Sequence, residues 1–257
     1  VDTIVHLAGM NAPEAETDPE RAMMERSLLT LRLVNASIAA GIKRFIYISS
    51  AKVYGLNLTG MVDEDTPVRP INHYAITHHT AESYILAAHN KKVFDGIVLR
   101  LSNGLGVPVT PDVDCWGIIA NDFCKQAVET RCIEMTGTGE AKRNFIPMSG
   151  VVDTLCFALD VPRDVIKDGL FNLGGASAMK IIELAKLISN RCERLFGFKP
   201  EILHAAHTPG EVYPELNYTS KKLVDSGFAP QSDITQEIDD ILRLCKVNLA
   251  TTSNVEI

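Results

Sequence analysis

Short apolar runs alternate with longer segments of helical periodicity over the first hundred residues. The apolar runs have the length of buried parallel strands and are followed by small or hydroxyl residues; they cover residues 3–7, 45–48 and 96–101. A first helix is predicted from the favourable start Asp18-Pro19 to Ala40, before Gly41, and a second over residues 74–89. This strand–helix–strand–helix–strand order predicts an α/β fold with a doubly wound parallel sheet.

The pattern becomes less regular after Asn103. Strand-like segments and helical periodicity recur at residues 118–128, 170–173, 181–196, 201–205 and 234–244. The tail at residues 250–257 has neither pattern and is expected to be disordered. We therefore expect two parts: residues 1–105, to which the segment 145–175 returns, and residues 106–257.

The composition indicates which kinds of binding partner the protein is not expected to have. The chain has 257 residues, 46% of them hydrophobic, and its net charge of -7 comes without a basic run, so no nucleic-acid partner is expected. Neither a signal peptide nor an apolar run of about 18 residues is present, so no membrane partner is expected. Six scattered cysteines without a CxxC pair predict reduced thiols, no metal site and a cytoplasmic location.

Two candidate binding segments lie where predicted strands end. The first strand ends in His6-Leu7-Ala8-Gly9, where small side chains allow a ligand to approach the backbone at the carboxyl edge of the sheet. Such a strand end also serves packing alone. Ser50 follows the second strand, where its hydroxyl can bind a substrate oxygen or can simply form a turn.

A candidate proton-transfer pair lies on the second predicted helix. Tyr74 and His78 are four residues apart and therefore share one helix face. A phenol that exchanges protons at neutral pH needs its pKa of about 10 lowered, which a neighbouring cation can do. A half-buried tyrosine and an exposed histidine on an amphipathic helix would leave the same pattern, so both interpretations stay open.

Together these clusters resemble the extended short-chain dehydrogenase/reductases, the NAD-dependent epimerase/dehydratase family that includes nucleotide-sugar epimerases. The matching stretches cover nearly the whole chain: VDTIVHLAG, AAGIKRFIYISSAKVYG, DEDTPVRPINHYAITHHTAE, IVLRLSNGLGVP, KRNFIPMSGVVD, GLFNLGG and PGEVYPELNYTSKKLVDSGFAP. The resemblance implies an incomplete Rossmann fold with a smaller C-terminal α/β part that binds substrate. It also implies NAD or NADP as cofactor, with NAD favoured, and a nucleotide-sugar substrate.

The resemblance also implies residue roles. Ser50 would bind the reacting sugar oxygen, Tyr74 would be the general acid/base, and His78 stands at the family's third catalytic position. The positions that match cofactor contacts are Leu7, Ala8, Gly9, Tyr74 and His78. The positions that match substrate contacts are Ser50, Asn103 and Arg143.

The chain departs from the family pattern at several places. His78 replaces a lysine, and an imidazole with a usual pKa of about 6.5 is mostly neutral at pH 7. Arg26 replaces an asparagine, while Ala51 and Lys52 replace the acidic pair of the family's dehydratases, which disfavours 4,6-dehydration. The family's glycine-rich loop is not in the sequence, so about 60 residues of the fold are expected to be missing and the choice between NAD and NADP cannot be read.

Three functions follow from this pattern. The first is an NAD(P)-dependent nucleotide-sugar epimerase or ketoreductase. The second is a non-catalytic protein of the same fold that binds a nucleotide sugar or a dinucleotide, and the third is a reductase of a non-sugar ketone. The family resemblance also implies a homodimer that pairs through the helices at residues 18–40 and 74–89.

Overall fold

Two compact units make up the computed structural model, which describes residues 1–110, 113–206 and 212–253. Unit 1 contains residues 1–102, 152–174 and 218–230. Unit 2 contains the described residues of 103–151, 175–217 and 231–257. The chain therefore crosses between the units several times, and neither unit is one continuous segment.

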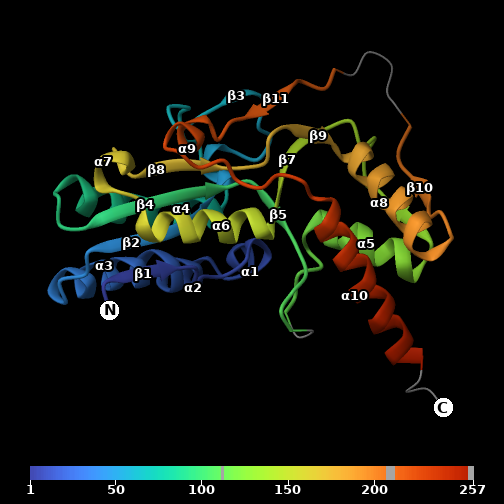
Figure 1. Cartoon of the computed structure of the whole chain (residues 1–257), viewed down its shortest axis with the longest axis horizontal. Coiled ribbons are helices and arrows are strands. Elements are labelled where there is room, and N and C mark those ends of the chain that lie inside the picture. Colours follow the sequence, from blue (N-terminus) through green and yellow to red (C-terminus); the bar gives the residue numbers. More distant parts are fainter. Residues whose placement is uncertain (111–112, 207–211, 254–257) are drawn as a thin grey trace. The chain divides into compact units, whose positions relative to one another are not determined.

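Four parallel strands form the sheet of unit 1, in the order β1-β2-β4-β8 (Figure 1). These strands are β1 (Thr3–His6), β2 (Arg44–Ser50), β4 (Asp95–Leu101) and β8 (Leu170–Leu173). In this register Ile46 lies between Val5 and Ile97. Three consecutive residues of β2, Phe45 to Tyr47, are fully buried, which explains the continuous apolar run there.

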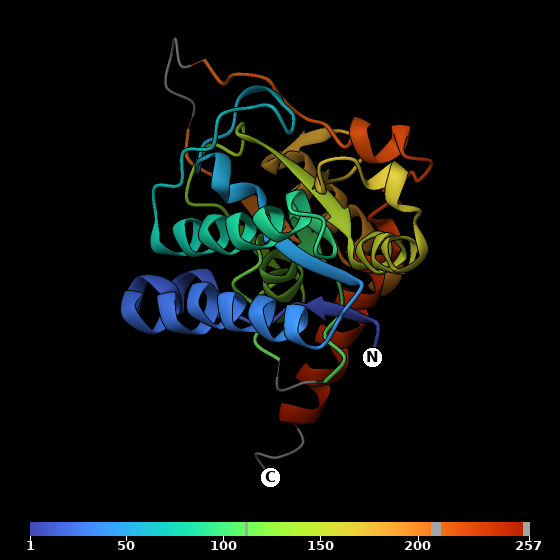
Figure 2. The same cartoon turned by 90° about the vertical axis from the view of Figure 1, so that its left-hand side faces the viewer.

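Helices cover both faces of this sheet. The connection from β1 to β2 contains α1 (Ala12–Thr17), α2 (Pro19–Ala22), the π-helical segment η1 (Met23–Leu28) and α3 (Leu29–Ala39). The connection from β2 to β4 contains α4 (His73–Asn90). Figure 2 shows α3 and α4 side by side on one face of the sheet, and α6 (Met148–Asp160) on the other.

The first predicted helix is present from Pro19 to Ala39, where α2, η1 and α3 follow one another without a break in helical backbone. Asp18 accepts a hydrogen bond from the backbone N–H of Arg21 and caps α2, as its sequence context predicts. Asn11 caps an additional helix, α1, in a reciprocal arrangement with Glu14. The π-helical turn η1 then carries Arg26 into the interior, where 5% of this residue is exposed.

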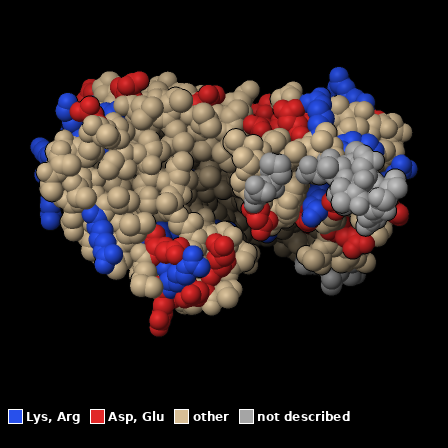
Figure 3. Space-filling view, turned by 90° about the horizontal axis from the view of Figure 1, so that it is seen from below, with Lys and Arg blue, Asp and Glu red and all other residues tan. Residues whose placement is uncertain are grey.

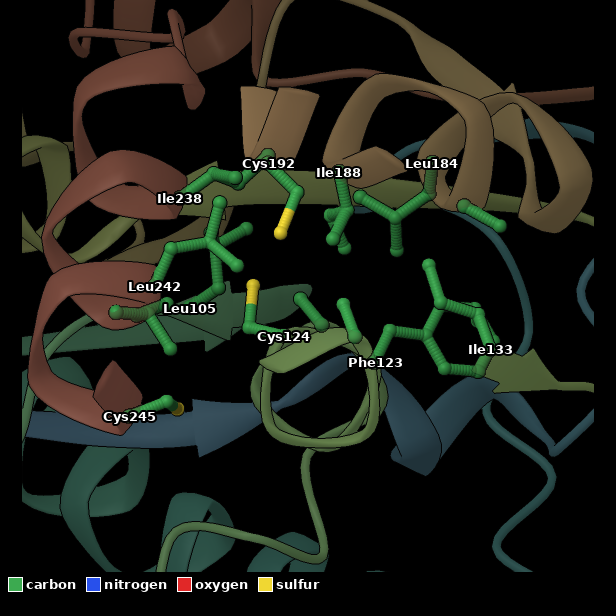
Figure 4. Packing of buried hydrophobic residues seen from close by; sticks show 14 of the residues in the cluster. Leu105, Phe123, Cys124, Ile133, Leu184, Ile188, Cys192, Ile238, Leu242 and Cys245 are labelled. Atoms are coloured by element: carbon green, nitrogen blue, oxygen red, sulfur yellow. The ribbon is translucent and has the colours of Figure 1, made fainter. Parts of the chain in front are cut away.

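Unit 2 is built from a small sheet and three long helices. Strands β5 (Asn103–Leu105), β7 (Lys142–Pro147) and β9 (Ala178–Lys180) form one sheet, and β6 (Cys132–Glu134) pairs with β10 (Glu201–Leu203). Helices α5 (Ile119–Glu129), α8 (Ile181–Phe196) and α10 (Thr235–Ser253) pack together around a shared apolar core. Figure 4 shows Cys124 and Cys192 pointing toward one another in this core.

All six cysteines are free thiols, as the spacing predicts, and four are buried. Burial raises the pKa of Cys124 well above its usual value and that of Cys192 to about 11. These thiols therefore pack as apolar side chains.

Lysine and arginine side chains are mixed with aspartate and glutamate on the face seen in Figure 3.

The remaining elements are short, and the end of the chain differs from expectation. They are η2 (Ala51–Tyr54), β3 (Gly60–Val62), α7 (Arg163–Ile166), β11 (Leu216–Tyr218) and α9 (Lys221–Asp225). The disorder predicted from residue 250 is wrong for residues 250–253, because α10 continues to Ser253; residues 254–257 lie outside the described residues. None of the helices in the described part of the chain is long and apolar enough to span a membrane.

Candidate active site

Tyr74 lies in the first turn of α4, which Asn72 caps, and its side chain is partly exposed. The edge of its ring packs against His78, with 4.5 Å between ring centroids. Two cations lie over the same ring: Cζ of Arg26 is 5.1 Å and Nζ of Lys52 is 5.2 Å from its centroid. The phenol is thus surrounded by one imidazole and two positive charges from three different elements.

His78 is a buried residue, with 3% exposed, and not the exposed histidine of a surface helix. Its Nδ1 lies 2.7 Å from the hydroxyl of Tyr47 on β2. Burial lowers the pKa of His78 well below its usual value, and the charges of Arg26 and Lys52 lower it further. Burial also raises the pKa of Tyr47, so a protonated phenol and a neutral imidazole share this hydrogen bond.

The hydrogen bond to Tyr47 uses Nδ1 and leaves Nε2 as the other polar atom of the ring. When the Tyr47 hydroxyl donates to Nδ1, the proton of the neutral ring resides on Nε2. Nε2 is buried and has no hydrogen-bond partner among the described residues. Buried donors are nearly always paired, so this N–H points to a ligand that accepts a hydrogen bond there.

The loop after β1 is locked to Arg26. The guanidinium donates to the backbone carbonyl of Met10, and a Cβ at Gly9 would lie 2.5 Å from its Cζ. Gly9 has φ +149, which also favours glycine. Leu7 and Ala8 are exposed beside it, so the end of β1 offers backbone and small side chains to a ligand.

Ser50 ends β2 at the carboxyl edge of the sheet. It is 8% exposed, and its Oγ accepts a hydrogen bond of 3.2 Å from the backbone N–H of Lys52. This bond caps η2, the short helix whose side chain at position 52 lies over the Tyr74 ring. The strand end that carries the serine therefore lies alongside the first turn of α4.

A buried ion pair holds α4, the helix that carries Tyr74, against the sheet. Glu82 on α4 forms two hydrogen bonds of 3.0 and 2.9 Å with the guanidinium of Arg100 on β4. Burial alone would raise the pKa of Glu82, but hydrogen bonds from His79 and Arg100, with the guanidinium charge, hold it below its usual value. The pair fixes α4 to the sheet two turns after Tyr74.

The tyrosine of the VYG segment belongs to a second buried network. Tyr54 donates to Oδ1 of Asn172 at 2.8 Å, and its ring lies 4.7 Å from Cζ of Arg100. Tyr218 donates to the backbone carbonyl of Arg100 at 2.5 Å. Burial raises the pKa of Tyr54 to about 12, so this phenol stays protonated and serves structure.

The two predicted substrate contacts lie in unit 2. Asn103 donates from Nδ2 to the carbonyl of Asn144 at 2.8 Å, a bond between β5 and β7. Arg143 is exposed and lines a cavity of about 430 Å³, together with Asp122, Thr138 and residues of the 134–139 turn. No cluster of three or more potential metal ligands occurs within the described ranges.

Comparison with known proteins agrees with this geometry. A model of the "NAD dependent epimerase/dehydratase family" matches residues 1–174. The chain belongs to this family. The family resemblance and the parallel α/β fold predicted from the sequence are therefore confirmed, whereas the roles of individual residues stay predictions.

Relatives within the family include both epimerases and dehydratases. A dTDP-D-glucose 4,6-dehydratase of Mus musculus is 29% identical over 154 residues, which are 60% of this chain but 41% of that protein. A putative UDP-glucose 4-epimerase of Methanocaldococcus jannaschii is 23% identical over 253 residues, 98% of this chain and 79% of that protein. The chain thus matches less than half the length of the mouse relative.

Several solved structures have the same fold. RMD from Pseudomonas aeruginosa, complexed with NADPH, has a TM-score of 0.77 and 26% identity over 96% of this chain and 81% of that one. A UDP-N-acetylglucosamine 4-epimerase from Methanobrevibacter ruminantium has a TM-score of 0.78 and 22% identity over 94% of this chain and 76% of that one.

The burial of His78 predicts a dependence of stability on pH. Its pKa is lowered in the folded state, so below about pH 6.5 the unfolded chain binds a proton that the folded chain does not. The free energy of unfolding therefore falls as the pH falls. In His78→Asn, whose amide oxygen can accept from Tyr47, this loss should be smaller by about 1.4 kcal/mol per pH unit below that point.

Urea unfolding at a series of pH values measures this difference. His6, whose pKa is also lowered by burial, keeps its own contribution in the variant. His73→Asn, at an exposed position of the same helix, is the matched control. Parallel pH profiles for the wild type and His78→Asn would contradict the buried neutral imidazole.

Proposed function

We propose that the protein is an NAD(P)-dependent nucleotide-sugar epimerase or ketoreductase in which Tyr74 is the general acid/base. The observation that carries this proposal is the environment of Tyr74: one neutral imidazole whose buried Nε2 has no partner among the described residues, and two cations over the phenol ring. A structural tyrosine needs none of these. The family membership supports the same class of reaction.

The residues present fit a nicotinamide dinucleotide. Nε2 of His78 is buried and has no partner in the described part of the chain, so it suits a ribose hydroxyl. The exposed end of β1 at Leu7, Ala8 and Gly9 suits close approach of the cofactor. We propose that these residues and Tyr74 hold NAD, or less favourably NADP. When bound, the nicotinamide would exchange a hydride with a sugar carbon.

The proposed mechanism assigns two tasks to side chains of unit 1. Ser50 would donate a hydrogen bond to the oxygen on the reacting sugar carbon, and Tyr74 would remove or return the proton of that oxygen. Elimination of water would need an acid and a base directly after Ser50. Ala51 and Lys52 occupy those positions, so epimerisation or ketone reduction is favoured over dehydration.

We propose that unit 1 binds the cofactor and that unit 2 binds the nucleotide part of the substrate. The cavity lined by Arg143 contains one cation, two carboxylates, Asp122 and Glu134, and the hydroxyl of Thr138. Arg143 suits a diphosphate, because guanidinium groups form paired hydrogen bonds with phosphate oxygens. Asn103, which holds β7 in place through its amide, would support this strand and contribute to the same substrate part.

Replacing Arg143 with glutamine should weaken UDP binding by about 10- to 100-fold, since a hydrogen bond to a charged group contributes roughly 1.5–3 kcal/mol. Isothermal titration with UDP measures the change. Arg194→Gln, at an exposed position on α8 outside the cavity lining, is the control and should bind as the wild type does. Equal affinities of both variants would exclude this cavity as the nucleotide site.

The proposed function is tested by turnover. Full-length protein is incubated with UDP- and dTDP-sugars and NAD(P)(H), and the epimer ratio and nicotinamide absorbance are followed. We expect interconversion of epimers or consumption of reduced nicotinamide with at least one sugar. No turnover across a broad sugar panel, with cofactor binding intact, would contradict the proposal.

A non-catalytic protein of the same fold is the second candidate. It is favoured by one observation, the neutral His78 where the family has a lysine. Binding of UDP-sugars and dinucleotide without turnover would identify it. In that case Tyr74→Phe would leave both affinities unchanged.

We also propose that the protein is a cytoplasmic homodimer that pairs through the helices on one face of unit 1. Large apolar side chains are exposed there: Met24 and Leu28 on η1, and Ile76 and Tyr84 on α4, are 37–57% exposed. Helices α4 and η1 are in contact, so these side chains belong to one helical layer. Sedimentation equilibrium of wild type and Met24→Glu tests the pairing.

A further inference from the structure

The cation that the family places one turn after its catalytic tyrosine is absent from position 78. His78 is held neutral by burial, and its Nδ1 is occupied by the Tyr47 hydroxyl. It therefore offers a hydrogen bond but no charge. Two other cations approach the Tyr74 ring instead, and they come from segments outside α4.

The backbone of Lys52 is fixed by hydrogen bonds on both sides of the residue. Its N–H donates to Ser50 Oγ at 3.2 Å, and its carbonyl accepts from the N–H of Gly55 at 3.1 Å. The residue itself is exposed, yet Nζ lies 5.2 Å from the centroid of the Tyr74 ring. The short helix η2 thus holds the backbone from which this cation reaches the Tyr74 ring.

Arg26 is the second cation over the Tyr74 ring, and its surroundings differ from those of Lys52. It is buried and donates to the carbonyl of Met10, and no carboxylate of the described residues forms an ion pair with it. A buried guanidinium without a counter-charge favours the appearance of a negative charge nearby. A phenolate at position 74 would supply that charge.

We propose that Lys52, assisted by Arg26, is the positioning residue that stabilises the phenolate of Tyr74, in place of the lysine that the family has at position 78. Its use in catalysis rests on the proposed function, whereas the electrostatic effect can be measured without any substrate.

Other charged and titratable groups also face this part of the molecule. They are Arg26 on η1, Tyr47 on β2, Lys52 on η2, His78 on α4, His6 on β1 and Glu16 on α1. Two carboxylates lie nearby. Glu16 accepts a hydrogen bond of 2.8 Å from the backbone N–H of His73, and Glu82, whose charge also acts on Tyr47, is paired with Arg100. His6 and His78 are neutral at pH 7 because burial lowers their pKa values. The two cations are therefore the groups that favour a phenolate.

The test is an ultraviolet titration of one phenol. Phenolate formation is followed by near-ultraviolet absorbance in the protein and in its Tyr74→Phe variant, and the difference isolates Tyr74. Burial raises the pKa values of Tyr47, Tyr54 and Tyr218, so these phenols titrate later. The same pair of titrations is recorded with Lys52→Met, Lys52→Arg and Lys52→Glu.

We expect the midpoint of the difference titration to rise by about one pH unit in Lys52→Met, the usual effect of losing one nearby charge. Lys52→Arg should restore it, and Lys52→Glu should raise it further. Lys91→Met is the matched control: it removes an exposed lysine at the opposite end of α4 and should leave the midpoint unchanged. A general loss of structure would not be rescued by arginine.

An unchanged midpoint in Lys52→Met, or the same change in Lys91→Met, would overturn the proposal. Because the titration needs neither sugar nor nicotinamide, it gives its result even if the protein has no turnover. Conversely, an active enzyme with an unchanged midpoint would refute the role of Lys52 and leave the proposed function standing.

Discussion

Turnover of nucleotide sugars should fall by about 10²- to 10⁴-fold when Tyr74 is replaced with phenylalanine, the usual contribution of a general acid or base. The phenylalanine ring keeps the edge contact with His78 and the stacking beneath the two cations, so the fold should be retained. The substitution removes only the hydroxyl. Steady-state rates with the best sugar of the panel measure the effect as a fall in kcat with little change in KM.

The matched control for this prediction lies on the same helix. Tyr84 is 38% exposed and outside the proposed site, and Tyr84→Phe should keep the wild-type rate. A Tyr74→Phe enzyme that retains the wild-type kcat would remove Tyr74 from the chemistry.

Glu82→Gln should lower the free energy of unfolding by about 3–5 kcal/mol, because it leaves the Arg100 guanidinium buried without its charge partner. Both side chains are almost fully buried, at 1% and 4% exposed, and their hydrogen bonds are paired. The pKa of Glu82 is held below its usual value, so the ion pair persists through neutral pH and is lost as the pH falls through that lowered value. Urea unfolding measures the difference.

Two further variants separate the buried pair from ordinary surface charges. Lys221→Met breaks the exposed pair with Asp225 and should cost less than about 1 kcal/mol. Replacing both Glu82 and Arg100 by apolar residues should recover part of the loss, since no isolated charge then remains. A Glu82→Gln protein as stable as Lys221→Met would show that the pair contributes nothing.

Local patterns were enough to predict the elements that carry the site. The run at residues 45–48 lies inside β2, the helix predicted over 74–89 is α4, and α8 has the predicted bounds. These segments combine one clear period with a clear end; for α8 the end is Gly197 in the left-handed conformation. Ser50 and Tyr74 could therefore be placed at the end of a strand and the start of a helix.

The surroundings of Tyr74 could not be predicted in the same way. Arg26 enters the interior because η1 is a π-helical turn, and no residue pattern marks such a turn. Tyr47 looks like one more apolar residue of a buried strand, yet its hydroxyl forms a hydrogen bond with Nδ1 of His78, 31 positions away. Contacts of this range depend on the packing of whole elements, which a local pattern does not contain.

The most direct test of the central claim is a crystal structure of the full-length protein with a nicotinamide dinucleotide and a UDP-sugar. We expect one sugar hydroxyl to lie within hydrogen-bond distance of both the Ser50 Oγ and the Tyr74 hydroxyl, with the Nε2–H of His78 on the cofactor ribose. A sugar bound away from both oxygens, or packed side chains filling the space between Ser50 and Tyr74, would contradict the account.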